Sequence, residues 1–154
     1  MTPNENSELT RRFIEEVLNT GDMDKADEFL APDFVEHSAP PGFAGTREGV
    51  KQVFIALHQA FPDFKYIIEE TIAQNDLVVH RITGEGTMQG ALFGMQPTGK
   101  HATWPEIHIA RVRDGKIVEH WDVIDRLTRL QQLGLAPTLG QSNSMSGSKT
   151  FEVS

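Results

Sequence analysis

The fold is decided by residues 101–125, HATWPEIHIARVRDGKIVEHWDVID. Two runs rich in β-branched and aromatic residues flank Asp114-Gly115, a dipeptide that favours a tight turn between antiparallel strands. The pattern therefore predicts one long hairpin, with strands over His101–Arg113 and Lys116–Asp125. Because successive side chains in a strand point to opposite faces, the register of this hairpin decides which residues share a face.

Two registers are open for this hairpin. A two-residue turn would pair Arg113 with Lys116, and it would place Asp122 and His108 on opposite faces. A type I turn with a bulge at Gly115 would shift the pairing by one residue. One face would then carry most of the ionisable and large aromatic side chains, namely Trp104, Glu106, His108, His120 and Asp122.

In this second register His108 would lie opposite His120, and Glu106 would lie opposite Asp122. The other face would be largely apolar, with Ile107, Ile109, Arg111, Ile117, Glu119, Trp121 and Val123. A sheet packed on helices usually turns its polar face to water, which is one interpretation of the ionisable set. The other interpretation is that this face lines a pocket closed by the helices. The sequence pattern is compatible with both.

Asp122 and His108 would suit a pocket of this kind. Burial raises the pKa of a carboxyl group, which can then exchange a proton with a carbon acid or a carbonyl group near neutral pH. A neighbouring imidazole can orient the carboxylate or share its proton. We therefore expect Asp122 and His108 to be catalytic, and Trp104, Glu106 and His120 to contact the substrate.

Metal binding and ion pairing are alternatives for the same region. The histidines are scattered, without HxH or HxxxH spacing, so a metal site would have to assemble in space from His108, His120 and Glu106. We predict no metal and no cofactor. Arg81 lies within a predicted strand, where it would bind a substrate oxygen or, in a slightly favoured alternative, pair with Glu85 or another acid.

The rest of the chain supplies helices and further strands. Apolar residues at helical spacing predict three N-terminal helices, over residues 7–20, 23–30 and 46–61. Asn6 or Ser7 is expected to cap the first, and Phe54 lies on the apolar face of the third, where we expect it to contact substrate. Residues 34–37 are expected to be extended, and alternation predicts strands over 64–73 and 77–87. Helices followed by an antiparallel meander indicate an α+β fold, with the helices on one face of a curved sheet.

Composition limits the possible functions. The 154 residues fit one domain, which we place at 1–137, followed by a flexible tail over 138–154. A net charge of −8 disfavours nucleic-acid binding. Because no apolar run approaches the ~20 residues that span a bilayer and no secretory signal is visible, we expect a cytoplasmic protein without membrane contact. The sequence contains no cysteine, which excludes disulfides and thiol catalysis.

Three stretches are distinctive: LFGMQPTGK at residues 92–100, IARVRDGKIVEHWD at 109–122, and Asp125 followed by LQQLG at 130–134. Together they resemble SnoaL-like polyketide cyclases, and the resemblance extends over residues 8–137. It implies a fold like that of nuclear transport factor 2: a cone of three helices over a strongly bent, mostly antiparallel sheet that encloses a cavity.

The resemblance also implies a reaction. Members of this family close a ring of an aromatic polyketide by intramolecular aldol condensation, usually on a methyl ester and without metal or cofactor. By resemblance, Asp122 is the general acid–base that removes a proton next to the ester and later protonates the new alkoxide. His108 would orient Asp122 or bind a substrate oxygen, and His37 would lie in the cavity. The implied substrate is a small apolar, polyketide-like carbonyl compound.

Two alternatives stay open. One is a non-catalytic protein that binds a hydrophobic metabolite. The other is an epoxide hydrolase or hydratase, which needs an Asp-Arg-Asp set to which Asp122 and Arg81 would contribute. For any of these functions, the cyclase included, we expect a second copy to bind the apolar outer surface of the hairpin, which includes Ile107, Trp121 and Val123, and to form a homodimer or tetramer.

Overall fold

The computed structural model describes residues 1–138; residues 139–154, almost all of the predicted tail, lie outside the described residues. The described chain contains the α-helices α1 (Pro3–Phe13), α2 (Arg47–Ala60) and α3 (Arg126–Gln132). A π-helical turn (η1, Ile14–Leu18) continues α1, and a 3₁₀ helix (η2, Met23–Glu28) follows it. The strands are β1 (Leu30–Glu36), β2 (Lys65–Gln74), β3 (Leu77–Thr87), β4 (His101–Arg113) and β5 (Lys116–Ile124).

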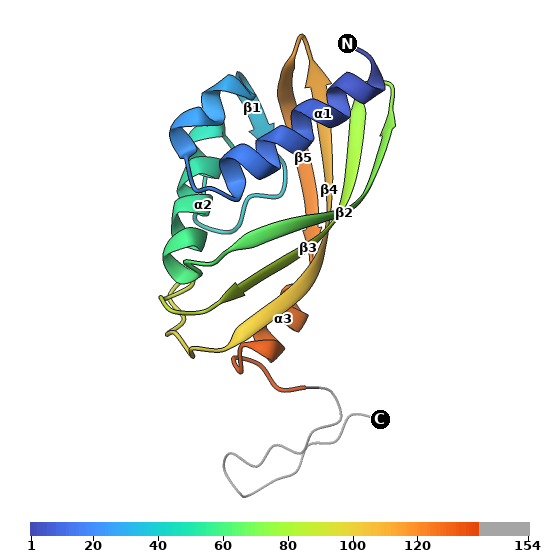
Figure 1. The fold of residues 1–154 in the computed structure, drawn as a ribbon. Helices are drawn as coiled ribbons and strands as arrows, with labels where there is room; N and C mark the ends of the chain where they lie inside the picture. The colour runs from blue at the N-terminus through green and yellow to red at the C-terminus, as the bar shows by residue number, and fades with distance from the viewer. Residues whose placement is uncertain (139–154) are drawn as a thin grey trace, which may run out of the picture.

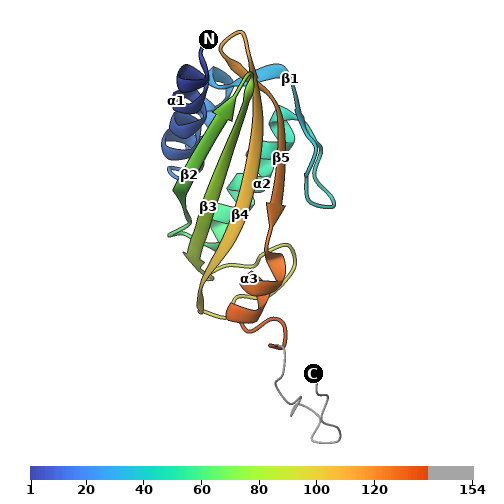
Figure 2. The ribbon, with the colours of Figure 1, turned by 90° about the vertical axis from the view of Figure 1, so that its right-hand side faces the viewer.

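These strands form one sheet in the order β1-β5-β4-β3-β2, in which β1 runs parallel to β5 and all other neighbours are antiparallel. The sheet is strongly bent, and α1 and α2 lie on the same face of it (Figure 1). The short α3 lies beyond the end of β5 (Figure 2). The predicted α+β cone of N-terminal helices on a curved sheet is confirmed. No helix within residues 1–138 is long and apolar enough to cross a membrane.

The first helix begins earlier than predicted. Its N-cap is Thr2, not Asn6 or Ser7. The Thr2 hydroxyl accepts a hydrogen bond from the Glu5 N–H at 3.1 Å, and the Glu5 carboxylate accepts one from the Thr2 N–H at 3.1 Å. This reciprocal pair satisfies backbone donors that the first turn leaves free, so the helix can begin upstream of its apolar stripe.

The strand β1 is longer than predicted and pairs with a strand from the other end of the chain. We expected only residues 34–37 to be extended, but the strand begins at Leu30 and ends at Glu36. Pro32 lies inside it, which is tolerated because an edge strand has one side that needs no N–H donor. The parallel pairing with β5 places Glu36 beside His120 and so brings an acidic residue to the hairpin.

The hairpin combines features of both predicted registers. Both residues of Asp114-Gly115 have positive φ, 51° and 74°, and this two-residue turn pairs Arg113 with Lys116. The pairing then shifts by one residue at Val118 on β5. The prediction of a bulge at the turn glycine is therefore wrong. Ile117, which we expected on the outer face, is buried because it precedes the bulge.

The displaced bulge still brings the two predicted catalytic residues to one face. His108 lies directly opposite Asp122, not opposite His120, and Glu106 lies opposite Ile124, not opposite Asp122. The pairs are wrong, but the predicted shared face is right. It carries Trp104, Glu106, His108, His120 and Asp122.

Gly84 in β3 leaves room for a large side chain behind this face. A Cβ at Gly84 would lie 2.7 Å from the Trp104 indole, closer than real contacts allow. Trp104 is almost fully buried, and its ring centroid lies 5.7 Å from that of Phe61. The missing side chain therefore allows the indole to pack against the strand, where it reaches Glu106.

Candidate active site

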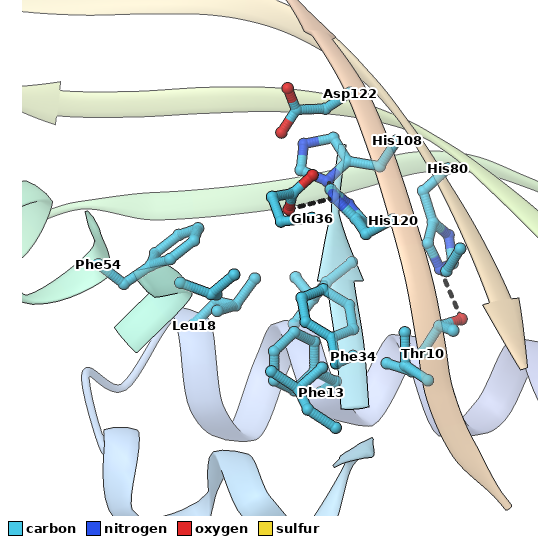
Figure 3. Close-up of a pocket in the computed structure, with 15 residues that line it drawn as sticks. Thr10, Phe13, Leu18, Phe34, Glu36, Phe54, His80, His108, His120 and Asp122 are labelled. Atoms are coloured by element: carbon cyan, nitrogen blue, oxygen red, sulfur yellow. Dashed lines mark hydrogen bonds and ion pairs between the residues drawn. The ribbon is translucent and has the colours of Figure 1, made fainter. Parts of the chain in front are cut away.

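A pocket lies between the helices and the inner face of the sheet (Figure 3). The space between its lining atoms, together with the open solvent at its mouth, is about 510 Å³. Its apolar wall includes Phe13, Leu18, Phe34 and Phe54, and its ionisable wall includes Glu36, His108, His120 and Asp122. The structure thus decides between the two interpretations of the hairpin, because the ionisable face lines a cavity.

A second pocket adjoins the first at Asp122. The space between its lining atoms, together with open solvent, is about 430 Å³, and its walls share Glu36, Val50, Phe54 and Asp122 with the first pocket. Beyond this shared wall it is bounded by the chain after β1 and by Arg126 at the start of α3. Asp122 therefore lies where the two spaces meet, within reach of a ligand that occupies both.

The Asp122 carboxylate is the ionisable group of the pocket that the protein leaves available. Its backbone N–H donates a hydrogen bond to Ser38 Oγ at 2.9 Å, but no group within residues 1–138 donates one to its carboxylate. One of its oxygens and one ring nitrogen each of His108 and His120 all lie within 4.8 Å of one another. Burial raises the pKa of Asp122, and the positive charges of the two imidazoles oppose this rise only in part.

Beside Asp122 the two imidazoles are linked to each other and to two glutamates. His108 Nδ1 lies 2.9 Å from His120 Nε2. His120 Nδ1 lies 2.7 Å from a carboxylate oxygen of Glu36, and His108 Nε2 lies 2.7 Å from a carboxylate oxygen of Glu106. The four side chains therefore form one hydrogen-bonded chain, Glu36–His120–His108–Glu106, that runs along the wall of the pocket beneath Asp122.

Glu106 holds the buried end of this chain. Besides His108, it accepts hydrogen bonds from the Tyr66 hydroxyl at 2.9 Å and from the Trp104 indole N–H at 2.6 Å. Burial alone would raise the pKa of Glu106, but the bond and charge of His108 and the two other donors hold that pKa below its usual value. Burial and the negative charge of Glu106 raise the pKa of Tyr66 well above its usual value, so Tyr66 stays a donor.

The same contacts favour the protonated form of His108. Burial favours the neutral imidazole, but the hydrogen bond and negative charge of Glu106 outweigh it and raise the pKa of His108. Its side chain is 5% exposed and that of Glu106 is 1% exposed, so solvent does not screen the attraction between them. The site thus favours a positive charge on the buried His108 beside Asp122, a carboxyl group with a raised pKa.

His80 is a neutral neighbour of this cation. It lies opposite His108 in the β3–β4 pairing, and its two ring nitrogens lie 2.8 Å from the hydroxyls of Thr10 and Thr71. Burial, together with the charges of His108 and His120, lowers the pKa of His80 to about 4. We did not predict a role for His80, although its even position in β3 could have indicated that it faces inward.

A family model of SnoaL-like polyketide cyclases matches residues 8–133. The chain belongs to this family. The chain is 33% identical to the aklanonic acid methyl ester cyclase DnrD of Streptomyces peucetius over 133 residues. The match covers 82% of this chain and 89% of the relative. Over 126 residues, 76% of this chain and 89% of the relative, it is 30% identical to the nogalonic acid methyl ester cyclase of Streptomyces nogalater.

A solved structure supports the same assignment. IdmH from Streptomyces antibioticus, a candidate polyketide cyclase, superposes with a TM-score of 0.74 at 34% identity, over 84% of this SnoaL-like chain and 98% of IdmH. The fold predicted from the resemblance is therefore that of the family. The names of the curated relatives support the expectation of an enzyme of the cyclase class.

Most of the predicted site residues lie together in the structure. Asp122, His108, His120 and Phe54 line the pocket. Trp104 and Glu106 lie behind this wall, buried, where they hold His108 and do not face the pocket themselves. Glu36 and Tyr66 were not predicted, because the sequence pattern indicates neither the pairing of β1 with β5 nor the residue that binds Glu106.

Two predicted residues lie outside the pocket. His37 directly follows the inward-facing Glu36, so it faces the other way, where it stacks on Trp121 at 4.7 Å and lies 2.8 Å from the Glu119 carboxylate. Arg81 directly follows the inward-facing His80, and its exposed side chain pairs with Glu70 at 2.8 Å. In both cases the alternation of a strand carries the side chain to the outer face.

The SnoaL-like site has the residue types of a metal centre but not the free ligand atoms. His108, His120 and Asp122 are the one such group found within residues 1–138, with Asp122 in the place that we had considered for Glu106. However, both ring nitrogens of both histidines are already hydrogen-bonded. A metal ion would first have to separate the two imidazoles, so the arrangement fits proton transfer better than metal binding.

Proposed function

We propose that this chain is a SnoaL-like cyclase that closes a ring of a small apolar, polyketide-like carbonyl substrate by intramolecular aldol condensation, with Asp122 as the acid–base group and without a cofactor. One observation carries the proposal: the Asp122 carboxylate faces an apolar pocket, accepts no hydrogen bond from residues 1–138, and has a raised pKa. Such a group can take a proton from carbon near neutral pH.

The reaction follows from this placement. Asp122 takes the acidic proton from the carbon next to the ester, and the conjugated carbonyl groups of the substrate delocalise the resulting negative charge. The carbanion attacks a second carbonyl carbon of the same molecule, which forms the carbon–carbon bond and an alkoxide that is then protonated. The apolar wall, including Phe34 and Phe54, folds the substrate so that the two carbons meet, and this proximity lowers the entropic part of the barrier.

The shape of the site supports an elongated substrate. Asp122 lies at the junction of two adjoining spaces, so a substrate that reacts near its middle would fill both with apolar groups. The relatives DnrD and the nogalonic acid methyl ester cyclase are named for esters of this general kind. Aklanonic acid methyl ester is therefore the first compound to test.

The experiment is to incubate the purified protein with aklanonic acid methyl ester and to follow product by chromatography and mass spectrometry. We expect Asp122→Asn to lower kcat by about 100-fold to 10,000-fold, the range typical of general acid–base groups, while the circular dichroism spectrum stays that of the folded protein. Glu119→Gln, on the outer face, is the matched control and should keep full activity. Full activity of Asp122→Asn would refute the proposal, and loss of activity after dialysis against EDTA would refute cofactor independence.

The apolar pocket also supports the second candidate, a protein that binds a hydrophobic metabolite without converting it. Tight binding of the ester with no product from the wild-type protein would favour it. The epoxide-hydrolase alternative has less support, because Arg81 lies outside the pocket and pairs with Glu70. Label from H₂¹⁸O in the product would be needed to revive it.

A further inference from the structure

The chain Glu36–His120–His108–Glu106 contains three hydrogen bonds and therefore needs three protons. Each bond requires one proton between its two heavy atoms. Two neutral imidazoles supply only two protons. If both of these point outward to the glutamates, the facing nitrogens His108 Nδ1 and His120 Nε2 present lone pairs to each other at 2.9 Å. The observed geometry thus requires one proton more than two neutral histidines carry.

The contacts of the chain show where this third proton belongs. Glu106 accepts from Tyr66, from Trp104 and from His108, and an indole N–H can only donate, so Glu106 is filled with donors and is ionised. At the other end, Glu36 is the partner of His120 Nδ1 at 2.7 Å, and its side chain is 11% exposed. With Glu36 as the acceptor from His120 Nδ1, as Glu106 is the acceptor from His108 Nε2, the extra proton lies between the two imidazoles.

We propose that His108 and His120 share one proton at neutral pH, and that this imidazole pair, not Asp122, protonates the alkoxide formed by ring closure. The inference rests on the proposed function and deepens it by dividing the acid and base roles. Asp122 is then the base alone. Glu36 is a positioning residue, because it acts only by holding the proton and the orientation of His120.

The proton balance of this division closes. Asp122 takes a proton from the substrate carbon, and the electron pair left behind forms the new carbon–carbon bond. The electrons of the carbonyl double bond move to its oxygen, which takes the shared proton as the hydrogen bond between His108 Nδ1 and His120 Nε2 opens toward the pocket. Asp122 then returns its proton to the pair across a gap of at most 4.8 Å, and both groups regain their starting state.

Several charged and titratable groups surround the pair. On the strands around it they are Glu36 on β1, Tyr66 on β2, His80 on β3, Glu106 on β4 and Asp122 on β5, and Arg129 of α3 lies near Glu106. Three of these are carboxylates in or beside the pocket and one, Arg129, is a cation, while His80 is neutral and Tyr66 is protonated. The local balance of charge therefore favours one cation on the imidazole pair.

The proton can be tested without any substrate. In protein labelled with ¹⁵N at histidine, we expect His108 Nε2 and His120 Nδ1 each to carry a proton at pH 7 and the two facing nitrogens to share a third. Glu36→Gln keeps an oxygen acceptor but removes the charge, so it should lower the pH at which the pair loses its shared proton. Glu119→Gln makes the same change beside His37 on the outer face and should leave the signals of the pair unchanged. Only two protons on the four nitrogens in the wild-type protein would overturn the proposal.

The division of roles can be tested with substrate in D₂O. Asp122→Asn should lose both deuterium exchange at the substrate carbon and ring closure. His120→Gln should keep exchange within about threefold of the wild-type rate while ring closure falls about 100-fold. Equal losses of exchange and ring closure in His120→Gln would overturn the assignment. If the wild-type protein shows neither reaction, the proposed function fails, while the nitrogen signals still decide whether the pair holds its proton.

Discussion

The sheet has a histidine–glutamate pair on each of its two faces, and the two pairs differ in their surroundings rather than in their contact. On the inner face His108 and Glu106 lie 2.7 Å apart, with side chains 5% and 1% exposed. On the outer face His37 and Glu119 lie 2.8 Å apart, with side chains 38% and 31% exposed. The distances are nearly equal, so the contact itself does not distinguish the two pairs.

Their surroundings do distinguish them. The outer pair is partly exposed to water, which weakens its attraction, and exposed ion pairs of this kind contribute at most about 1 kcal/mol. The inner pair is shielded from water, is joined to two further hydrogen-bond donors, and lies beside the available carboxylate of Asp122. A pair becomes useful for catalysis when burial makes its charge persist and a reactive group lies next to it.

Deletion of Val118 should have the largest effect on stability, because it would turn the later side chains of β5 to the opposite faces of the sheet. Removal of the bulge would shift the later residues of β5 by one position and turn Asp122 and His120 to the outer face. We expect the loss of most of the ~5–15 kcal/mol that stabilises a domain of this size, seen as loss of a cooperative thermal transition. Val118→Ala keeps the residue count and should remain folded. A stable deletion protein would mean that the bulge does not set the faces.

The next largest effect on stability should come from substitution of the buried Glu106, and the same substitution at the exposed Glu119 should have much less effect. Glu106→Gln places an amide among three donors and leaves the His108 cation without its partner, so we expect a loss of about 3–5 kcal/mol in the free energy of unfolding. Glu119→Gln should cost less than about 1 kcal/mol. Urea denaturation of both variants at pH 7 measures the difference. Equal losses would show that burial does not separate the pairs.

His80 should make stability depend on acidity. Its pKa is lowered from 6.5 to about 4 in the folded protein, so the unfolded chain binds the proton more tightly. The contribution of His80 is then complete above pH 6.5 and falls by about 3 kcal/mol as the pH drops toward 4. His108 has the opposite sign, because its raised pKa makes its contribution largest at low pH and lost as the pH rises through that pKa. The difference between wild type and His80→Gln, measured from pH 7 to pH 4, isolates the first effect, and parallel curves would contradict it.

Substitution on the outer face of the sheet should have the smallest effect on the stability of the monomer. We propose that a second copy covers Ile107 and Val123, which lie opposite each other in the β4–β5 pairing and are 45% and 76% exposed. Val123→Lys should change the free energy of unfolding of the monomer by less than about 0.5 kcal/mol, since exposed positions are tolerant. Sedimentation equilibrium should show weaker association of this variant. An unchanged molecular mass would mean that this surface is not the interface.

The sequence was sufficient for what depends on local pattern. Alternation in residues 101–125 predicts both strands and, within each strand, the side chains that share a face. It does not locate the bulge, because a turn at Asp114-Gly115 with or without an added residue has the same local signature. The position of Val118 depends on how β5 is paired on both edges, which is a tertiary property.

The missed residues have the same cause. Glu36 joins the site only because β1 pairs in parallel with β5, and a contact between such distant residues leaves no periodic signal nearby. His37, one position later, was assigned to the cavity by resemblance, but strand alternation sends it to the outer face. An assignment that is shifted by one position at the end of β1 therefore selects the surface residue His37 in place of the pocket residue Glu36.

The parallel pairing of β1 with β5 has a consequence for how the protein folds. The bond between Glu36 and His120 joins positions 84 residues apart, and such distant contacts form slowly because a long loop must close first. The helices and the β2–β5 meander can form from closer contacts. Glu36 therefore joins the hydrogen-bonded histidines only when β1 reaches β5. Until then, a partly folded molecule has the wall of the pocket but lacks the carboxylate that orients His120. Recovery of activity during refolding should lag behind recovery of the sheet.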